Sequence, residues 1–167
     1  MSIKTRQLSA VEANIVHDLA WDIWPHAFKD ILEEDQIKYM LEWMYDVNTL
    51  QEQMLTGTMY FTVEEFGRPK GFIGVEPNYP NSGYLRIHKF YILPEEQGKG
   101  LGRVLFNQVV DTAFDVECQK LHLNVNRFNK AVDFYKYLGF NITGEENIDI
   151  GKDYLMEDYI MELELRS

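Results

Sequence analysis

Three glycines within five residues, Gly98, Gly100 and Gly102, separate an apolar segment ending at Leu93 from a long helical pattern. Glycine lacks a Cβ, so the backbone at these positions can turn sharply and approach a bound molecule closely. From Gly100 to Val116, apolar residues recur every four positions, as in a helix that packs against a sheet. The glycines therefore predict a strand-to-helix junction, where the first N–H groups of the helix and the positive end of its dipole form an anion site.

The hydrophobic spacing predicts a mainly helical N-terminal third, followed by strands and helices in alternation. Helices are expected at residues 10–24, 33–45, 49–54, 100–116 and 130–138, with Pro25 ending the first. Strands are expected at residues 3–8, 58–63, 72–75, 84–93, 120–125, 140–148 and 154–165. This order predicts an α+β fold with one central β-α-β crossover, and the length of 167 residues suits a single domain over residues 1–167.

Composition and charge argue against several classes of partner. The net charge of −11 disfavours nucleic acid, whose binding depends on clustered Lys and Arg. No apolar run reaches the roughly 18 residues of a membrane span, and residues 1–20 lack the apolar core of a signal peptide. Cys118 is the single cysteine, which fits a reducing compartment and excludes a zinc site of several thiolates. We therefore expect a cytoplasmic protein without nucleic-acid, membrane or metal binding.

The glycine-rich stretch differs from two common phosphate-binding motifs. It lacks the Gly-x-x-x-x-Gly-Lys-Ser/Thr pattern with its magnesium-binding hydroxyl, and its glycines do not form Gly-x-Gly-x-x-Gly. Nucleotide hydrolysis and hydride transfer are therefore not expected. The alternative to anion binding is that the glycines serve only the tight packing of the helix against the strand.

Two stretches carry residues of a known pair of motifs. Gln97-x-x-Gly100-x-Gly102 follows Tyr91-Ile92-Leu93-Pro94, and residues 124–140 contain Asn, Ala, Phe-Tyr and Gly-Phe in that order. These stretches resemble two motifs of the GNAT superfamily of N-acetyltransferases, the first of which holds the pyrophosphate of acetyl-CoA. The resemblance implies a mixed, mostly antiparallel sheet flanked by helices, and acetyl-CoA-dependent transfer. One departure is that Asn129 lies two residues before Ala131, where the family usually has three.

The resemblance also implies which residues bind acetyl-CoA. The strand before the loop and the strand at 120–125 are expected to be parallel neighbours that separate around the pantetheine arm, with backbone groups near Phe90 polarising the thioester carbonyl. The expected cofactor contacts are Phe90, Tyr91, Ile92, Gln97, Gly98, Lys99, Gly100, Leu101, Gly102, Arg103, Asn126, Asn129 and Tyr135. Which of Asn124, Asn126 and Asn129 touches the cofactor is left open.

Two side chains are candidates for proton transfer. Tyr135 matches the tyrosine that protonates the departing CoA thiolate in many GNAT enzymes, and the alternative is an ordinary packing aromatic. His88 stands where many relatives carry a glutamate, and a histidine with a pKa near 6.5 accepts a proton at neutral pH, directly or through water. The alternative for His88 is a partly buried side chain bonded to a neighbouring strand. Arg86 and His88 are expected on the same side of their strand.

The acceptor is predicted from weaker features. Trp24 and Phe28 lie where GNAT enzymes build the acceptor pocket, and residues 150–161 are loosely similar to the tail of bacterial polyamine acetyltransferases related to the spermidine/spermine enzymes. A polyamine or other small primary amine is therefore the first expectation. A protein N-terminus, as in ribosomal-protein acetyltransferases, is the second, and a CoA-binding regulatory module without turnover is the third. Trp43 and Tyr45, taken as exposed aromatics, are compatible with a homodimer.

Overall fold

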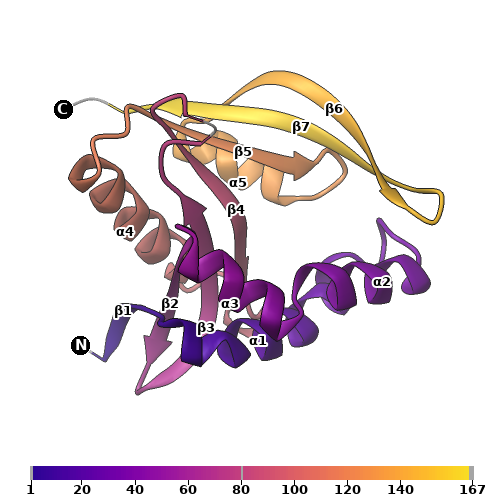
Figure 1. Cartoon of the computed structure of the whole chain (residues 1–167), viewed down its shortest axis with the longest axis horizontal. Helices are drawn as coiled ribbons and strands as arrows, with labels where there is room; N and C mark the ends of the chain where they lie inside the picture. Colours follow the sequence, from indigo (N-terminus) through magenta and orange to yellow (C-terminus); the bar gives the residue numbers. More distant parts are fainter. Residues whose placement is uncertain (1, 80, 166–167) are drawn as a thin grey trace.

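The computed structural model describes residues 2–79 and 81–165, which form a seven-stranded sheet with helices on both faces (Figure 1). The strands are β1 (Ile3–Gln7), β2 (Met59–Glu65), β3 (Arg68–Glu76), β4 (Tyr84–Ile92), β5 (Lys120–Asn126), β6 (Asn141–Gly151) and β7 (Tyr154–Glu164). Their order across the sheet is β1-β2-β3-β4-β5-β7-β6. Neighbouring strands are antiparallel except β4 and β5, which are parallel, so the predicted mixed sheet with a central crossover is confirmed.

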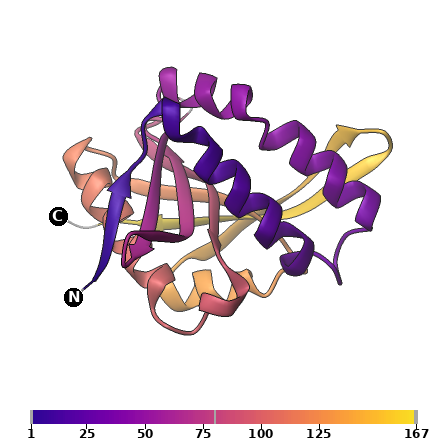
Figure 2. The same ribbon diagram turned by 90° about the horizontal axis from the view of Figure 1, so that it is seen from below.

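The helices form two groups, one on each face of the sheet (Figure 2). They are α1 (Ala13–Ala27), α2 (Glu34–Met44), α3 (Val47–Leu55), α4 (Leu101–Asp115) and α5 (Ala131–Leu138), with short 3-10 turns η1 (Ala10–Glu12) and η2 (Pro94–Glu96). The first three helices lie on one face, and α4 and α5 lie on the other. In the described part of the chain, every helix is too short or too polar to cross a membrane.

The end of α1 differs from the prediction. Pro25 lies inside the last turn, and the helix continues to Ala27, so the prediction that Pro25 ends it was wrong. A proline in the last turn removes one N–H donor, but the helix keeps its course for two more residues, where the buried neighbours Trp24 and Phe28 anchor it. Trp24 and Phe28 pack against Tyr91 of β4, with ring centroids 5.7 Å and 6.2 Å away, and the Phe28 N–H bonds the Trp24 carbonyl at 3.0 Å.

The expected exposure of the two aromatics near the end of α2 is correct for one residue and wrong for the other. Trp43 is 52% exposed, whereas Tyr45 is completely buried. Tyr45 is the residue at which the chain leaves α2, and its side chain turns inward. Its hydroxyl accepts a hydrogen bond from Nε1 of Trp24 at 3.1 Å, and its ring packs edge-on against Phe72. Tyr45 therefore belongs to the core between the first three helices and the sheet.

A β-bulge in β4 sets which side chains reach each face of the sheet. Gly74 of β3 pairs with Lys89 and Val75 pairs with Ile87, so His88 is an extra residue without its own partner on β3. Before the bulge, Ile87 points into the core under α4 and α5, and after it Phe90 does so. The alternation therefore shifts by one position, and His88 and Lys89 both lie on the face that carries α1–α3.

Candidate active site

The parallel pair β4 and β5 separates at one end. The two strands pair from Tyr84–Lys120 to Ile87–Leu123, and both continue beyond that point without pairing with each other. On its other edge β4 remains paired with β3 as far as Ile92, and β5 remains paired with β7 as far as Asn126. Backbone groups of β4 that face β5 beyond Ile87 therefore lack a strand partner, as expected for strands that separate around a ligand.

The glycine-rich loop joins η2 to α4 at the same end of the sheet. Gly98 and Gly100 have φ angles of 83° and 82°, a left-handed conformation that glycine adopts without strain. Gly100 is the N-cap of α4, and no side chain caps this helix end. A Cβ at either position would meet no atom within 4 Å, so the space above the loop is open. The first N–H groups of α4 have no partner within the helix and no capping side chain, so they are candidate donors for a ligand.

Gly102 has a different role from the first two glycines. A Cβ at this position would lie 3.2 Å from the Phe134 ring of α5, so the missing side chain allows α4 and α5 to approach each other. The expectation of tight packing is therefore confirmed for Gly102, whereas an anion site at Gly98 and Gly100 stays a prediction. Gly98 and Gly100 shape the open backbone, and Gly102 permits the contact between helices.

The charged and polar side chains of the loop are held by neighbouring residues. The buried carboxylate of Glu96 accepts a hydrogen bond from Lys99 at 3.0 Å and lies 3.6 Å from Lys70, and the Lys99 bond contributes most to lowering the pKa of Glu96. The Gln97 side chain donates to the Ile92 carbonyl at 3.3 Å. The Arg103 guanidinium lies 5.5 Å from the centre of the Tyr137 ring. The side chains of the loop are therefore held by neighbouring residues, and the donors left for a ligand are mainly its backbone N–H groups.

Tyr135 projects from α5 toward the separated ends of β4 and β5. Its ring is buried among Phe90, Phe134 and Phe140, with ring centroids 5.6–6.1 Å apart. Burial raises its pKa, so the phenol is protonated at neutral pH. The hydroxyl forms no hydrogen bond with another described residue, which leaves its proton free for a ligand.

The three asparagines near the start of α5 have distinct partners. The Asn126 side chain accepts a hydrogen bond from the Phe128 N–H, and the Asn129 side chain accepts one from the Ala131 N–H, both at 2.9 Å. These two residues therefore stabilise the turn before α5. Asn124 instead joins a polar network on the opposite face of the sheet. Contact of any of the three with a cofactor stays a prediction.

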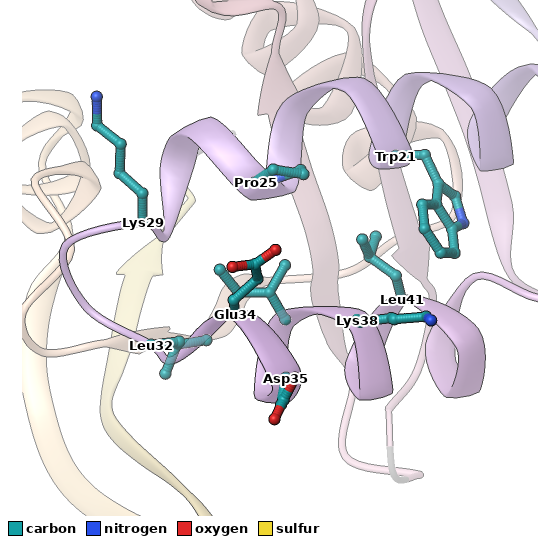
Figure 3. A pocket seen from close by; sticks show the side chains of 9 residues that line it. Trp21, Pro25, Lys29, Leu32, Glu34, Asp35, Lys38 and Leu41 are labelled. Carbon is teal, nitrogen blue, oxygen red and sulfur yellow. The ribbon is translucent and has the colours of Figure 1, made fainter.

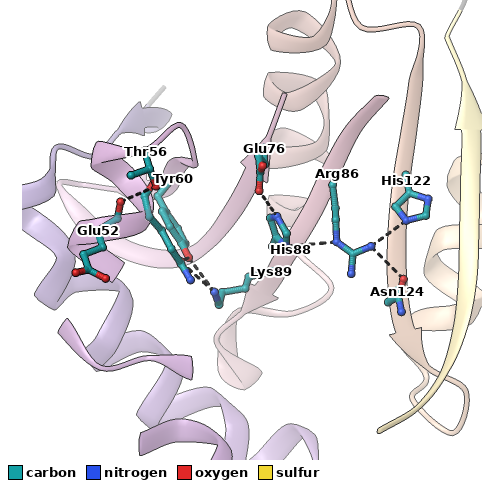
Figure 4. Close-up of polar contacts among 10 residues, drawn as sticks. Glu52, Thr56, Tyr60, Glu76, Arg86, His88, Lys89, His122 and Asn124 are labelled. Carbon is teal, nitrogen blue, oxygen red and sulfur yellow. Dashed lines mark hydrogen bonds and ion pairs between the residues drawn. The ribbon is translucent and has the colours of Figure 1, made fainter. Parts of the chain in front are cut away.

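His88 belongs to that polar network (Figure 4). Its Nε2 lies 2.9 Å from a carboxylate oxygen of Glu76, and its Nδ1 accepts from Nε of Arg86 at 3.3 Å. Because Arg86 can only donate, Nδ1 is the acceptor and Nε2 carries the proton. Burial lowers the pKa of His88, which favours the neutral ring. Arg86 and His88 share a face, as predicted, but both ring nitrogens of His88 are engaged, and its role as a base stays a prediction.

Two buried charged side chains on this face were not singled out from the sequence. Nζ of Lys89 donates to the Tyr60 hydroxyl at 2.9 Å and lies 5.1 Å from the centre of the Tyr45 ring, and burial lowers its pKa to about 8 (Figure 4). Asp158 of β7 is 5% exposed. Both residues lie in strands of mixed polarity, where the sequence alone does not show that they are buried.

The predicted acceptor residues lie inside the core rather than along a cavity. Trp24 and Phe28 are 1% and 2% exposed. A hollow of about 590 Å³ lies beyond them, between α1 and α2, and Figure 3 shows its lining. The lining side chains are Trp21, Pro25, Lys29, Leu32, Glu34, Asp35, Ile37, Lys38 and Leu41. Trp24 and Phe28 therefore pack against the ring of Tyr91 within the core. Their contact with an acceptor stays a prediction.

The fold and its sequence are similar to those of known acetyltransferases. The PaiA N-acetyltransferase of Thermoplasma acidophilum, solved in complex with coenzyme A, superimposes with a TM-score of 0.83 at 21% identity, over 99% of this chain and 100% of that one. A chimera of the spermidine N-acetyltransferase SpeG from Vibrio cholerae and hSSAT gives a TM-score of 0.69 at 22% identity, over 98% of this chain and 96% of that one.

Curated relatives match over shorter stretches. The peptidyl-lysine N-acetyltransferase YjaB of Escherichia coli is 33% identical over 98 residues, which is 58% of each chain. The chain spans about half the length of the curated relatives it matches. The model of the acetyltransferase (GNAT) family matches residues 13–140, which include the loop, the separated strands and α5. The chain therefore belongs to the GNAT family of acetyltransferases.

Proposed function

We propose that this protein transfers the acetyl group of acetyl-CoA to a primary amine by direct attack of the amine on the thioester. One observation carries the proposal: β4 and β5 separate beyond Ile87, with the glycine-rich loop at one end of the opening and Tyr135 beside it. Membership of the GNAT family and the coenzyme A complex of the PaiA relative support acetyl-CoA as the donor.

Backbone groups would hold the donor. The pyrophosphate would accept hydrogen bonds from N–H groups between Gly98 and Arg103, where the α4 dipole favours negative charge. The pantetheine arm would pair with the free edge of β4 near Phe90, Tyr91 and Ile92. An N–H of this edge would polarise the thioester carbonyl and stabilise the oxyanion that forms during attack.

The chemistry needs few reactive side chains. The neutral amine attacks the carbonyl carbon, the C–N bond forms, and the C–S bond then breaks to release the CoA thiolate. Tyr135 would donate a hydrogen bond to this thiolate from its free hydroxyl, because its raised pKa keeps the phenol protonated. Fixing the two reactants side by side contributes a further reduction of the barrier, roughly 7–11 kcal/mol in well-oriented systems.

We place a polyamine or another small aliphatic amine first among acceptors. The loose similarity of residues 150–161 to polyamine acetyltransferases and the net charge of −11 support a cationic acceptor. Two similar proteins are named as a spermidine N-acetyltransferase and a peptidyl-lysine N-acetyltransferase, and both of these named acceptors are aliphatic amines. The acceptor would approach from the α1–α3 face, opposite the helices α4 and α5 that flank the donor.

Release of free thiol from acetyl-CoA tests the proposal. We would measure it with spermidine, small monoamines, amino acids, aminoglycosides, lysine peptides and N-terminal peptides, each at the same concentration. The proposal predicts amine-dependent thiol release and an acetylated aliphatic amine in the products. Thiol release with N-terminal peptides alone would show that the acceptor is a protein N-terminus rather than a small amine. Acetyl-CoA binding without thiol release in the presence of any of the amines would indicate a regulatory module instead.

A further inference from the structure

Asp158 of β7 carries a buried carboxylate with one oxygen that has no partner. The side chain is 5% exposed, and Oδ1 forms no hydrogen bond with any residue of the described chain. Oδ2 accepts from the Asn124 side chain at 3.3 Å. A buried carboxylate oxygen without a donor is costly, and sites that bind a ligand are where such groups occur.

The neighbours of Asp158 hold its orientation without satisfying it. Nη1 of Arg86 donates to Oδ1 of Asn124 at 3.2 Å, so the N–H donors of the Asn124 amide point the other way, toward the carboxylates of Glu146 and Asp158. There Asn124 donates to Glu146 at 2.7 Å as well as to Asp158. The bond to Asn124 therefore fixes Oδ2, and Oδ1 remains available.

Asp158 lies at the open end of the separated strands. It pairs in register with Asn126, the last residue of β5, whereas β5 ceases to pair with β4 after Leu123. Across the opening, burial raises the pKa of Tyr91 of β4, and the nearby groups Tyr135 of α5 and Asp158 raise it further. The groups around the opening are thus a phenol from each of β4 and α5 and a carboxylate from β7.

We propose that Oδ1 of Asp158 binds the ammonium group of the acceptor and takes a proton from it before attack. This inference rests on the proposed acetyl transfer and adds the residue that receives the amine. Other carboxylates in the neighbourhood are already used: Glu76 pairs with His88, and Glu162 pairs with His122 and Lys120. Glu146 is exposed and bonded to Asn124.

The proton balance of the step is simple. One proton passes from the ammonium nitrogen to Oδ1 of Asp158, which leaves a neutral amine and a neutral carboxyl group. The amine lone pair then forms the C–N bond, the C–S bond breaks, and the nitrogen loses its second proton, which neutralises the thiolate while Tyr135 donates its hydrogen bond. Asp158 returns its proton to solvent when the product leaves.

The environment of Asp158 favours this exchange. Burial raises its pKa above that of an exposed aspartate, and the charge of Glu146 adds to that effect. The bond from Asn124 and the charges of Arg86 and Arg127 oppose it. The titratable and charged groups that face Asp158 are therefore Arg86 and Tyr91 from β4, Arg127 after β5, and Glu146 from β6.

Asp158→Asn tests the proposal, with Glu164→Gln as the control, which also removes a carboxylate from β7 but at the exposed end of the strand. At neutral pH we expect Asp158→Asn to lower kcat/KM for spermidine about 100-fold, because a positioned base commonly contributes that much. The loss should shrink as the pH approaches the pKa of the free amine, about 10, where the amine arrives neutral. Glu164→Gln should change kcat/KM less than about threefold, since exposed charges contribute little.

Calorimetry separates this inference from the proposed function. Both variants should bind CoA as tightly as the wild type, which shows that they fold, and only Asp158→Asn should lose spermidine binding to the CoA complex. Equal spermidine binding and equal pH profiles in Asp158→Asn and the wild type would overturn the role of Asp158 while leaving acetyl transfer intact. Failure of the wild-type CoA complex to bind any amine would also overturn it, whereas absence of acetyl-CoA binding would defeat the proposed function itself.

Discussion

The two faces of the sheet contribute different kinds of groups to the proposed site: backbone groups on one face and side chains on the other. On the α4–α5 face, the donor half consists of glycine backbone, the first turn of a helix and the free edge of β4. On the α1–α3 face, the acceptor half consists of side chains: a network across several strands holds His88 and Asp158, and Lys89 bonds Tyr60 separately. The donor half therefore depends on backbone conformation, and the acceptor half depends on which side chains the register brings together.

Gly100→Val gives the largest effect expected from this contrast. The left-handed conformation at φ 82° disfavours a branched residue, and the new side chain would fill the open space above the loop. Loss of about two charge-assisted hydrogen bonds to phosphate should weaken acetyl-CoA binding about 100-fold. Gly67→Val is the control, because Gly67 has φ 76° and equally open space in the β2–β3 turn. Equal acetyl-CoA affinities of the two variants in calorimetry would contradict a role of the loop backbone in binding the donor.

Tyr135→Phe tests the one donor-side position where a side chain is expected to act. Removing the hydroxyl should lower kcat about 30-fold, as expected for the loss of a hydrogen bond worth about 2 kcal/mol to a developing thiolate. The affinity for acetyl-CoA should change little, because the ring stays in place. Tyr137→Phe, on the same helix but 74% exposed, is the control. A normal kcat in Tyr135→Phe would leave the residue as a packing aromatic.

Lys89→Met is expected to have the smallest effect, and that effect is on the free energy of unfolding. It tests how much burial of the Lys89 ammonium group on the acceptor side destabilises the folded protein. The pKa of Lys89 is lowered to about 8 from 10.5 by burial, so the folded state loses this proton at lower pH than the unfolded state. Wild-type stability should therefore rise between pH 8 and 10.5, where the unfolded chain binds more protons. Lys89→Met should be about 2 kcal/mol more stable at neutral pH. Urea denaturation at neutral and alkaline pH checks this, and parallel pH dependences in the two proteins would contradict it.

The donor half of the proposed site was the part that could be predicted from the sequence. Gly98 and Gly100 mark a backbone conformation that other residues avoid, and local spacing alone places them between a strand and a helix. The hydrophobic pattern of α4 then predicts the crossover that makes β4 and β5 parallel. Tyr135 was found through the second motif, although its enclosure among aromatic rings depends on packing that the motif does not describe.

The acceptor half was not predictable to the same degree, because it depends on contacts between distant strands. The β-bulge at His88 shifts the alternation of β4, and nothing in the sequence of that strand marks the extra residue. Asp158 meets Asn124 only because β7 pairs with β5 in one register. Tyr45 was expected to be exposed and Trp24 to line an acceptor pocket, yet they pack with each other in the core. Local patterns predict exposure poorly where elements far apart in the chain cover one another.

A crystal structure of the protein with CoA and spermidine tests the division between the two faces most directly. We expect pyrophosphate oxygens within about 3 Å of N–H groups between Gly98 and Arg103, which is ordinary hydrogen-bonding distance. We also expect the CoA sulfur in the opening between β4 and β5 beside the Tyr135 hydroxyl, with a spermidine nitrogen bonded to Oδ1 of Asp158 on the opposite face. A pyrophosphate bound away from this loop, or both ligands on the same face of the sheet, would contradict the assignment of donor and acceptor to opposite faces.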